Sequence, residues 1–186
     1  MNFEIANSKI PGVYTLIQQN HIDERGSFNK IYDKDFFDIY LSGEIIKQIN
    51  RSITSEAGSV RGFHYQIPPY VETKIVACTR GKILDVALDL RKDSPTFMKF
   101  HSEILDDMNF KSLVIPPGVA HAFQTLTPNT ELLYLHTNYY NPSYEGIVNA
   151  LDPLVGFPWP TEITIRSERD QNAPFLNNGF SGVAYK

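Results

Sequence analysis

The sequence predicts a mainly β protein, a jelly-roll barrel with a few short helices. Aromatic residues make up 12% of the chain and are mostly Tyr and Phe, which favour pleated, half-buried surfaces. Short apolar segments recur between Val60 and Asn138. Turn signals separate them at about 8- to 12-residue intervals, the rhythm of an antiparallel sandwich or barrel. The 186 residues contain no linker, so we expect one domain spanning residues 1–186.

The segment before the β region predicts a turn and one helix. DERGSF, residues 23–28, has the composition of a turn. In YDKDFFDIYLSGE, residues 32–44, Asp33 can cap a helix that Gly43 ends. One face of that helix is apolar and carries Phe36, Phe37, Tyr40 and Leu41.

The strands are predicted at residues 60–66, 73–79, 82–90, 101–105, 112–118, 121–127 and 131–138. The segment ILDVALDL, residues 83–90, illustrates the alternation of a strand. Its two faces carry Leu84, Val86, Leu88 and Leu90 on one side, and Asp85, Ala87 and Asp89 on the other. A barrel built from such strands has an interior that can hold a small ligand.

The chain after Asn138 is rich in Pro, Gly and Asn, with short helical possibilities. SYEGIVNAL, residues 143–151, is one of these. The polar segment RSERDQNAP, residues 166–174, is predicted to lie over the mouth of the barrel. Residues 179–186 are expected to pair as an edge strand or to stay loose.

Charge and cysteine content restrict the partners and the compartment. The net charge is -4, and no basic run is present, so nucleic acid is an improbable partner. Cys78 is the only cysteine, which excludes an intrachain disulfide and favours a reduced compartment. No signal peptide and no membrane-length apolar run is found. We therefore expect a cytoplasmic protein that does not bind membranes.

Nucleotide-phosphate and metal motifs are absent from the sequence. It contains neither G-x-G-x-x-G nor G-x-x-x-x-G-K-[ST], and no H-E-x-x-H. PPGVAH, residues 116–121, resembles the second metal motif of the cupin barrels. The first cupin motif needs two histidines and a glutamate, whereas HYQ at residues 64–66 offers only His64. We predict a cupin-type double-stranded β-helix without a catalytic metal.

His64 lies in an apolar and aromatic run between two cations, Arg61 and Lys74. Taken alone, it fits a structural histidine as well as a proton carrier. Arg61 is out of phase with His64 on a regular strand unless a bulge intervenes at Gly62. Likewise, Tyr134 fits a core residue and Asp170 a helix cap, so no single residue here identifies a site.

Taken together, these segments occur in a familiar order. They are DERGSF, VRGFHYQ, TKIV, RGKILDVALDLRKDSPTF, LVIPPGVAHAF, ELLYLHTNYYNP, DPLVGFPWP and SERDQNAP. From about residue 23 to residue 174 the chain resembles the dTDP-4-dehydrorhamnose 3,5-epimerase family. The resemblance implies a cupin-like jelly roll that inverts the two carbons flanking a 4-keto group. It also implies that no cofactor is needed and that the protein is a homodimer.

The resemblance assigns four catalytic residues. His64 matches the base, and Asp170 matches the carboxylate that binds this histidine. Tyr134 matches the tyrosine that returns a proton on the opposite face of the sugar. Lys74 matches the lysine that faces the developing enolate oxygen, where a cation is needed for the reaction.

Further residues match substrate-binding positions of the family. His121 and Tyr140 match the lining of the sugar pocket. Arg61 and Arg25 match arginines near the diphosphate, where a guanidinium binds oxygens bidentately. Positions near the base or the sugar are matched by Phe28, Gln48 and Asn50, and Arg169 is included beside Asp170. The resemblance also implies that Arg25 and Phe28 reach into the partner's site.

The departures from the family pattern lie at the periphery of the predicted site. Lys30 stands where the family commonly has a glutamate near the nucleobase. Other changes are Phe63, Leu135, Ala150 and Leu151 in place of common family residues. Lys30 therefore leaves the nucleotide and the sugar open, while the residues that transfer protons are retained.

The sequence thus predicts a cofactor-independent epimerase. Its substrate would be a nucleotide-diphospho-4-keto-6-deoxy-hexose, inverted at C3 and C5 for synthesis of a surface polysaccharide, such as a lipopolysaccharide O-antigen, or of a glycosylated metabolite. A 3- or 5-mono-epimerase and a keto-isomerase of sugar nucleotides remain open. So do a metal-dependent cupin oxygenase and a non-catalytic sugar-nucleotide-binding module, although the combined set of proton-transfer residues is not needed for binding alone.

Overall fold

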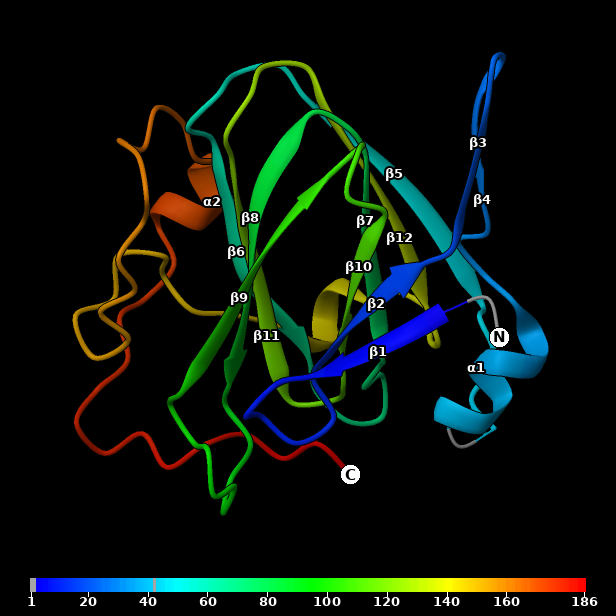
Figure 1. Cartoon of the computed structure of the whole chain (residues 1–186). Coiled ribbons are helices and arrows are strands. Elements are labelled where there is room, and N and C mark those ends of the chain that lie inside the picture. Colours follow the sequence, from blue (N-terminus) through cyan, green and yellow to red (C-terminus); the bar gives the residue numbers. More distant parts are fainter. Residues whose placement is uncertain (1–2, 42) are drawn as a thin grey trace.

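Two antiparallel sheets form a barrel in the computed structural model, which describes residues 3–41 and 43–186 (Figure 1). The six-stranded sheet has the order β1 (Phe3–Asn7), β2 (Tyr14–Gln18), β10 (Lys111–Ile115), β7 (Lys74–Arg80), β12 (Thr130–His136) and β5 (Gln48–Thr54). The five-stranded sheet has the order β13 (Glu145–Ile147), β6 (Val60–Gln66), β11 (Val119–Thr125), β8 (Lys82–Asp89) and β9 (Phe100–Asp106).

Three further elements complete the fold around this barrel. A separate hairpin of β3 (Asn20–Asp23) and β4 (Gly26–Asn29) projects from the barrel beside β5 (Figure 1). The helices are α1 (Lys34–Tyr40) and α2 (Glu168–Gln171), and a 3₁₀ turn spans Pro142–Tyr144. No helix in residues 3–41 and 43–186 is long and apolar enough to cross a bilayer.

The core lies both inside and outside the barrel. Between the sheets, Ile83 and Ala87 of β8 pack with Val76, Leu113 and Leu132 of the opposite sheet. The outer face of the five-stranded sheet is also buried, and its residues Val86, Leu88 and Leu90 pack with Val148 and Phe157 of the C-terminal segment. Asp85 and Asp89, which alternate with these leucines, are fully buried as well. Both faces of β8 therefore avoid water, and the carboxylates need partners inside the protein.

The six-stranded sheet is covered on its outer face by α1. Asp33 accepts a hydrogen bond from the Phe36 backbone N–H at 3.2 Å and caps the helix, as the sequence predicts. Phe37 and Leu41 pack against Leu16 of the sheet. The observed helix is shorter than residues 32–44, and Ser42 lies outside the described residues.

All the strands predicted between residues 60 and 138 are confirmed, to within three residues at each end. Strands β1, β2 and β5 were not predicted, and the turn at residues 23–28 proves to be part of a hairpin. The helix predicted within residues 143–151 is wrong, because only a 3₁₀ turn forms there. It is followed by β13, in which Ile147 is the register partner of His64 on β6. The edge of β6 offers this segment backbone partners, which override its weak helical pattern.

The last eight residues form no strand. Their single bridge joins Val183 to Arg91, so residues 179–186 follow the looser of the two predicted alternatives. Phe180 and Val183 nevertheless pack against the leucine face of β8. The red segment in Figure 1 accordingly runs beneath the five-stranded sheet.

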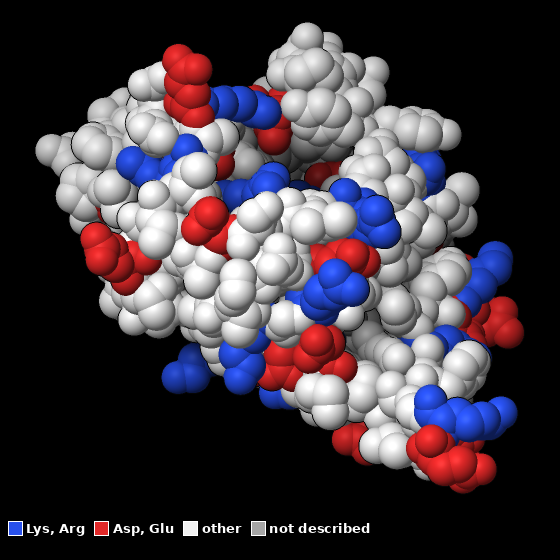
Figure 2. Space-filling view, turned by 90° about the horizontal axis from the view of Figure 1, so that it is seen from above, with Lys and Arg blue, Asp and Glu red and all other residues white. Residues whose placement is uncertain are grey.

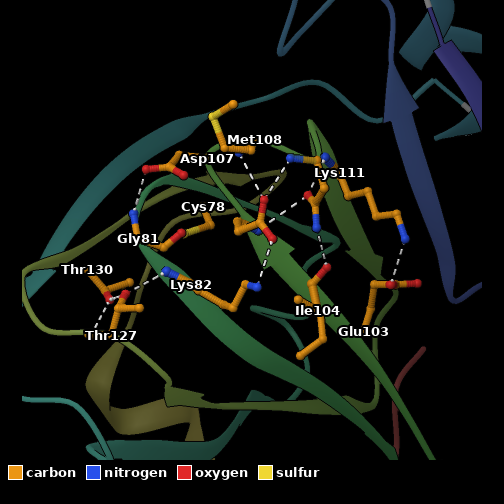
Figure 3. A network of polar contacts seen from close by, with 12 residues as sticks. Cys78, Gly81, Lys82, Glu103, Ile104, Asp107, Met108, Lys111, Thr127 and Thr130 are labelled. Atoms are coloured by element: carbon orange, nitrogen blue, oxygen red, sulfur yellow. Dashed lines mark hydrogen bonds and ion pairs between the residues drawn. The ribbon is translucent and has the colours of Figure 1, made fainter.

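A polar network fixes the turn between β9 and β10 (Figure 3). The Asp106 carboxylate accepts from the Met108 and Asn109 backbone N–H groups at 2.9 and 2.7 Å. Asp107 accepts from the Gly81 N–H at 2.9 Å and ties this turn to the β7–β8 turn. These contacts hold one end of the barrel without any disulfide, since Cys78 is a free, buried thiol.

The surface carries mixed charge. On the face seen in Figure 2, acidic and basic side chains lie next to one another and form no single-sign field. Many of them are paired, such as Lys82 with Asp106 at 3.6 Å. This distribution agrees with the absence of a basic run in the sequence and does not favour a polyanionic partner.

Candidate active site

A bulge in β6 brings Arg61 and His64 to the same side of the strand. His121 of β11 is opposite His64, whereas Phe123, two residues further along, is opposite Arg61, three residues away on β6. The extra residue reverses the alternation between Arg61 and His64, as the sequence required of a bulge at Gly62. Gly62 has φ of +110°, and a Cβ there would approach the His121 carbonyl oxygen to 2.4 Å. Glycine is therefore needed at this position.

His64 is paired with Asp170, which lies 106 residues further along the chain. The imidazole Nε2 lies 2.7 Å from Asp170 Oδ1, and the Gly62 N–H donates to Oδ2 at 3.3 Å. Asp170 is buried on the short helix α2, which Ser167 caps. Burial alone would raise the pKa of Asp170, but the hydrogen bonds from His64 and Gly62 hold it below its ordinary value.

The ionised Asp170 carboxylate fixes the tautomer of His64. A carboxylate only accepts hydrogen bonds, so Nε2 carries the proton and donates a hydrogen bond to Asp170. The other nitrogen, Nδ1, is then the basic one. His64 thus has the arrangement of a general base whose orientation is set by a buried carboxylate.

Two cavities meet at His64. The larger one, of about 420 Å³, is a cleft between the start of β6, the end of β5 and the segment around α2. Its lining includes Arg61, His64, Arg166, Arg169 and Asp170, so the segment predicted to cover the barrel mouth borders this cleft. The smaller cavity, called the inner cavity below, has a volume of about 10 Å³ and is lined by His64, Gln66, Glu72 and Lys74 among others. Lys74 is therefore brought close to His64.

Tyr134 approaches from the opposite sheet. It lies on β12 and its hydroxyl is 3.3 Å from the Ser52 hydroxyl. Burial raises the pKa of Tyr134 above its ordinary value, so at neutral pH the phenol keeps its proton and can donate it. Because His64 lies in the five-stranded sheet and Tyr134 in the six-stranded one, an imidazole and a protonated phenol come from different sheets.

His121 forms a second histidine–carboxylate pair deeper in the barrel. Its Nε2 is 2.6 Å from Asp85 Oδ1, and both side chains are buried. Burial raises the pKa of Asp85 and lowers that of His121. The imidazole also contacts Tyr134 edge to face, with ring centroids 6.1 Å apart. His121 therefore lies beside Tyr134 but lines neither of the two cavities at His64, and its place in the sugar pocket stays a prediction.

A second group of predicted residues is connected by hydrogen bonds to Glu145 and His136. The Tyr140 hydroxyl donates to Glu145 at 2.7 Å, and Arg169, next to Asp170, donates to the same Glu145 oxygen. Gln48 accepts from the Tyr140 backbone N–H at 3.2 Å. Asn50 lies 3.4 Å from His136. Of these predicted residues Arg169 lines the larger cavity, and the place of Tyr140, Gln48 and Asn50 in a substrate site stays a prediction.

Three predicted residues lie outside the cleft of their own chain. Arg25 is at the tip of the β3–β4 hairpin, paired with Asp23 at 2.5 Å, and Phe28 is 73% exposed on the same hairpin. Lys30 binds Asp33 at 2.6 Å, at the start of α1. The fold of a single chain therefore gives these three side chains no place beside His64.

Sequence reasoning missed four polar residues of the site: Glu72, Asp85, His136 and Glu145. The signal for Asp85 was present, because an aspartate flanked by Leu84 and Val86 in a strand needs a buried partner. Glu72 and His136 carried no comparable signal, since each resembles a solvated residue near a strand end. Their partnership depends on β7 and β12 lying side by side, with His136 opposite Lys74.

The arrangement defines a class of protein: a cupin-like barrel that transfers protons at a carbon next to a carbonyl. It offers an imidazole paired with a carboxylate, a protonated phenol on the other sheet and a lysine that lines a cavity with the imidazole, the kinds of group that such chemistry requires. Among residues 3–41 and 43–186, no group of three or more His, Cys, Asp or Glu is placed to hold a metal ion.

Comparisons with known proteins identify the family. The dTDP-4-dehydrorhamnose 3,5-epimerase family matches residues 7–178, and this chain belongs to it. The chain is 35% identical over 174 residues to the dTDP-4-dehydrorhamnose 3,5-epimerase of Salmonella typhimurium, covering 93% of this chain and 95% of the relative. The chain is accordingly an isomerase of the epimerase type, with a cupin-like jelly roll.

Two solved structures illustrate the range of this similarity. The dTDP-6-deoxy-D-glucose-3,5-epimerase of Legionella pneumophila, in complex with dTDP-4-keto-L-rhamnose, has a TM-score of 0.90 and 30% identity and covers 99% of both chains. A 3'-monoepimerase of Streptomyces bikiniensis, in complex with dTDP-quinovose, has a TM-score of 0.85 and 33% identity. It covers 90% of this chain and 85% of its own. Similarity in fold thus extends across enzymes of different stereochemical outcome.

Proposed function

We propose that this epimerase inverts C3 and C5 of a nucleotide-diphospho-4-keto-6-deoxy-hexose during deoxysugar biosynthesis. The observation that carries the proposal is the placement of two proton carriers on different sheets, His64 with Asp170 on one side and Tyr134 on the other. Inversion of a carbon requires a proton to leave one face and to return on the opposite face. The names of the family and of its solved members support the choice of substrate class.

In the proposed mechanism, His64 Nδ1 removes the proton from the carbon next to the ketone. Asp170 steadies the imidazolium that results, because the buried carboxylate already accepts from Nε2. Loss of the proton turns the ketone into an enolate, and the negative charge moves to O4. Lys74, which shares the inner cavity with His64, supplies the positive charge for that oxygen.

Tyr134 then returns a proton to the carbon from the opposite face. Its raised pKa keeps the phenol protonated until it transfers the proton to the enolate carbon. The Ser52 hydroxyl, 3.3 Å away, orients the phenol hydroxyl. His121 packs against the phenol ring from the barrel interior. The His64 imidazolium then releases its proton to solvent, and the Tyr134 phenolate takes one up from solvent. The same sequence of steps at the other carbon beside O4 gives the second inversion, and no redox or nucleophilic cofactor enters it.

The nucleotide end of the substrate is proposed to occupy the larger cleft. Arg61 and Arg169 line it and provide guanidinium groups for the diphosphate. Tyr140, Gln48 and Asn50 are proposed to contact the sugar or the base. The hairpin residues Arg25 and Phe28, together with Lys30, are proposed to act on a neighbouring subunit's site.

A homodimer with shared sites follows from that assignment. The hairpin stands away from its own barrel and exposes Phe28 and Ile22, which are 73% and 76% exposed. Strand β5, an edge of the six-stranded sheet, likewise exposes Ile49 and Ile53. Apolar surface of this kind is typical of association sites. We also infer that residues 1–186 act as one domain, since the C-terminal segment completes the base.

Mixing two inactive variants tests whether sites are shared. In a mixture of R25A and H64A subunits, a hybrid dimer has one site with His64 from one chain and Arg25 from the other. Activity should therefore recover after subunit exchange. If Arg25 serves its own chain, no site is complete and the mixture stays as inactive as its components.

A reduced compartment is the expected location, because the single cysteine forms no disulfide. We infer a cytoplasmic enzyme on that ground. Fractionation of cells that express the chain from its own gene should recover it with cytoplasmic markers. Recovery with exported or membrane fractions would contradict this location.

The proposed reaction is tested by incubating the enzyme in D2O with dTDP-4-keto-6-deoxy-D-glucose and following the sugar by NMR. We expect deuterium at both C3 and C5. Deuterium at one carbon alone would identify a mono-epimerase, an outcome to which the Streptomyces bikiniensis structure gives weight. No deuterium with this nucleotide sugar or with its UDP and GDP counterparts would refute the proposal.

A further inference from the structure

A second carboxylate reaches the inner cavity, and the proposed mechanism makes no use of it. Glu72 lies two residues before Lys74 and lines the cavity that also contains His64 and Lys74. Its side chain is only 10% exposed. A buried carboxylate beside a developing enolate is unfavourable unless its own charge is compensated, because two like charges then approach in a medium of low dielectric.

Two neighbouring groups compensate Glu72. Its Oε1 lies 3.5 Å from Lys74 Nζ, and its Oε2 lies 2.8 Å from His136 Nδ1. All three side chains are nearly buried, with 10%, 13% and 12% exposure for Glu72, Lys74 and His136. Burial alone would raise the pKa of Glu72, but Lys74 and His136 together hold it below its ordinary value. The carboxylate is therefore ionised and accepts from both.

His136 extends this contact to the proposed acid. Because Glu72 only accepts, His136 Nδ1 carries a proton and donates to Glu72, while Nε2 lies 3.4 Å from the Asn50 amide nitrogen. The His136 ring also stacks on Tyr134, with centroids 6.0 Å apart and planes at 20°. One carboxylate thus connects the lysine opposite O4 with the imidazole that supports the tyrosine.

We propose that Glu72 is a positioning residue for Lys74, and that His136 is a positioning residue for both Glu72 and Tyr134. Lysine has a long stem that must be fixed before its ammonium can meet one oxygen atom. The two oxygens of Glu72 act on different partners, so the lysine and the tyrosine are oriented together. This inference deepens the proposed function and rests on it.

The first test is the isosteric variant E72Q, assayed with dTDP-4-keto-6-deoxy-D-glucose. Misplacement of a reacting group by about 1 Å costs on the order of 100-fold, so we expect kcat to fall between about 10- and 100-fold. KM should stay within about twofold, because the substrate's diphosphate and base are bound elsewhere. H136F keeps an aromatic ring beside Tyr134 but cannot donate to Glu72, and we expect a smaller fall in kcat.

The second test asks whether Glu72 acts through Lys74. In the K74A background there is no ammonium to orient, so E72Q should lower the residual deuterium exchange by less than about twofold. A merely structural role would lower exchange by the same factor in both backgrounds. Glu103 provides the matched control, because it is a partly buried glutamate of the same barrel that pairs with Lys111 at 2.9 Å, outside both cavities. E103Q should retain wild-type kcat.

The inference is overturned if E72Q retains wild-type kcat, or if it lowers exchange equally with and without Lys74. Wild-type enzyme is the reference in each assay. Absence of exchange by the wild type would refute the proposed function itself. Exchange by the wild type with no response to E72Q would refute only the positioning role.

Discussion

The barrel contains two histidine–carboxylate pairs with nearly the same geometry and opposite surroundings. His64 and Asp170 are 2.7 Å apart, and His121 and Asp85 are 2.6 Å apart. The two histidines are register partners on β6 and β11. However, the His64 side chain is 28% exposed toward the cleft, whereas that of His121 is 6% exposed.

The difference teaches that environment, more than geometry, distinguishes the proposed proton carrier His64 from the buried pair of His121 and Asp85. Asp170 receives additional stabilisation from the Gly62 N–H, and its pKa is lowered. Asp85 has one oxygen, Oδ2, without a hydrogen-bond partner among the described residues, and burial raises its pKa. In His64–Asp170, the open pair, the carboxylate is ionised and can stabilise an imidazolium. In His121–Asp85, the sealed pair, burial disfavours charge on either side chain.

The largest expected effect is the loss of deuterium exchange when the open pair, His64 and Asp170, is substituted. H64A should lower deuterium incorporation at C3 and C5 at least about 1,000-fold, and D170N should lower it by about 100- to 10,000-fold, because the amide no longer fixes the tautomer of His64. NMR-detected exchange in D2O measures both. Near-normal exchange in either variant, with an unchanged fold by circular dichroism, would contradict the assignment of the base.

A smaller effect is expected on stability, and there the order of the two pairs is reversed. H121A leaves the Asp85 carboxylate buried without its partner, which costs about 3 kcal/mol or more of unfolding free energy. H64A leaves Asp170 with the Gly62 N–H at the edge of a cleft, so we expect a loss of about 1 kcal/mol. Urea denaturation of both variants gives the comparison, and equal losses would show that the pairs are equally sealed.

The smallest expected effect is the opposite pH response of the two carboxylates. The pKa of Asp170 is lowered below 3.8, so its contribution to stability is present above that pH and is lost as the pH falls through the folded-state pKa. The pKa of Asp85 is raised above 3.8, so the folded state binds its proton more tightly and stability falls as the pH rises through the folded-state pKa.

Denaturation between about pH 2 and 6 separates these responses, because the Asp170 contribution changes mainly below its unfolded pKa and the Asp85 contribution above it. The stability advantage of the wild type over D170N should grow with pH, and its stability relative to D85N should decline. Parallel curves for the two variants would mean that the two carboxylates titrate alike, contrary to their surroundings.

Much of the fold could be predicted because the strands between residues 60 and 138 alternate strongly and are bounded by turn residues. The helix at residues 34–40 followed from Asp33 and an apolar face. Strands β1, β2 and β5 were missed because their polar residues hide the alternation, as in QINRSIT of β5. Residues 145–147 become a strand only because β6 lies beside them.

The candidate site was predictable where a motif carried it and unpredictable where only packing created it. His64, Asp170, Tyr134 and Lys74 were found from ordered motifs, and the first two proved to be in contact. Glu72 and His136 are 64 residues apart and meet only because β7 and β12 are paired. Arg25 and Phe28 lie on a hairpin away from the cleft of their own chain, so their role in a partner's site stays a proposal.

The distance in sequence between His64 and Asp170 also has a consequence for synthesis on the ribosome. Every strand of the barrel is complete by Ile147, yet the histidine acquires its carboxylate only when α2 has been made and has docked on β6. A nascent chain that ends at residue 165 would possess the barrel, the lysine and the tyrosine but lack an oriented base. By the proposed mechanism, a nascent chain therefore cannot turn over substrate until α2 has emerged and docked.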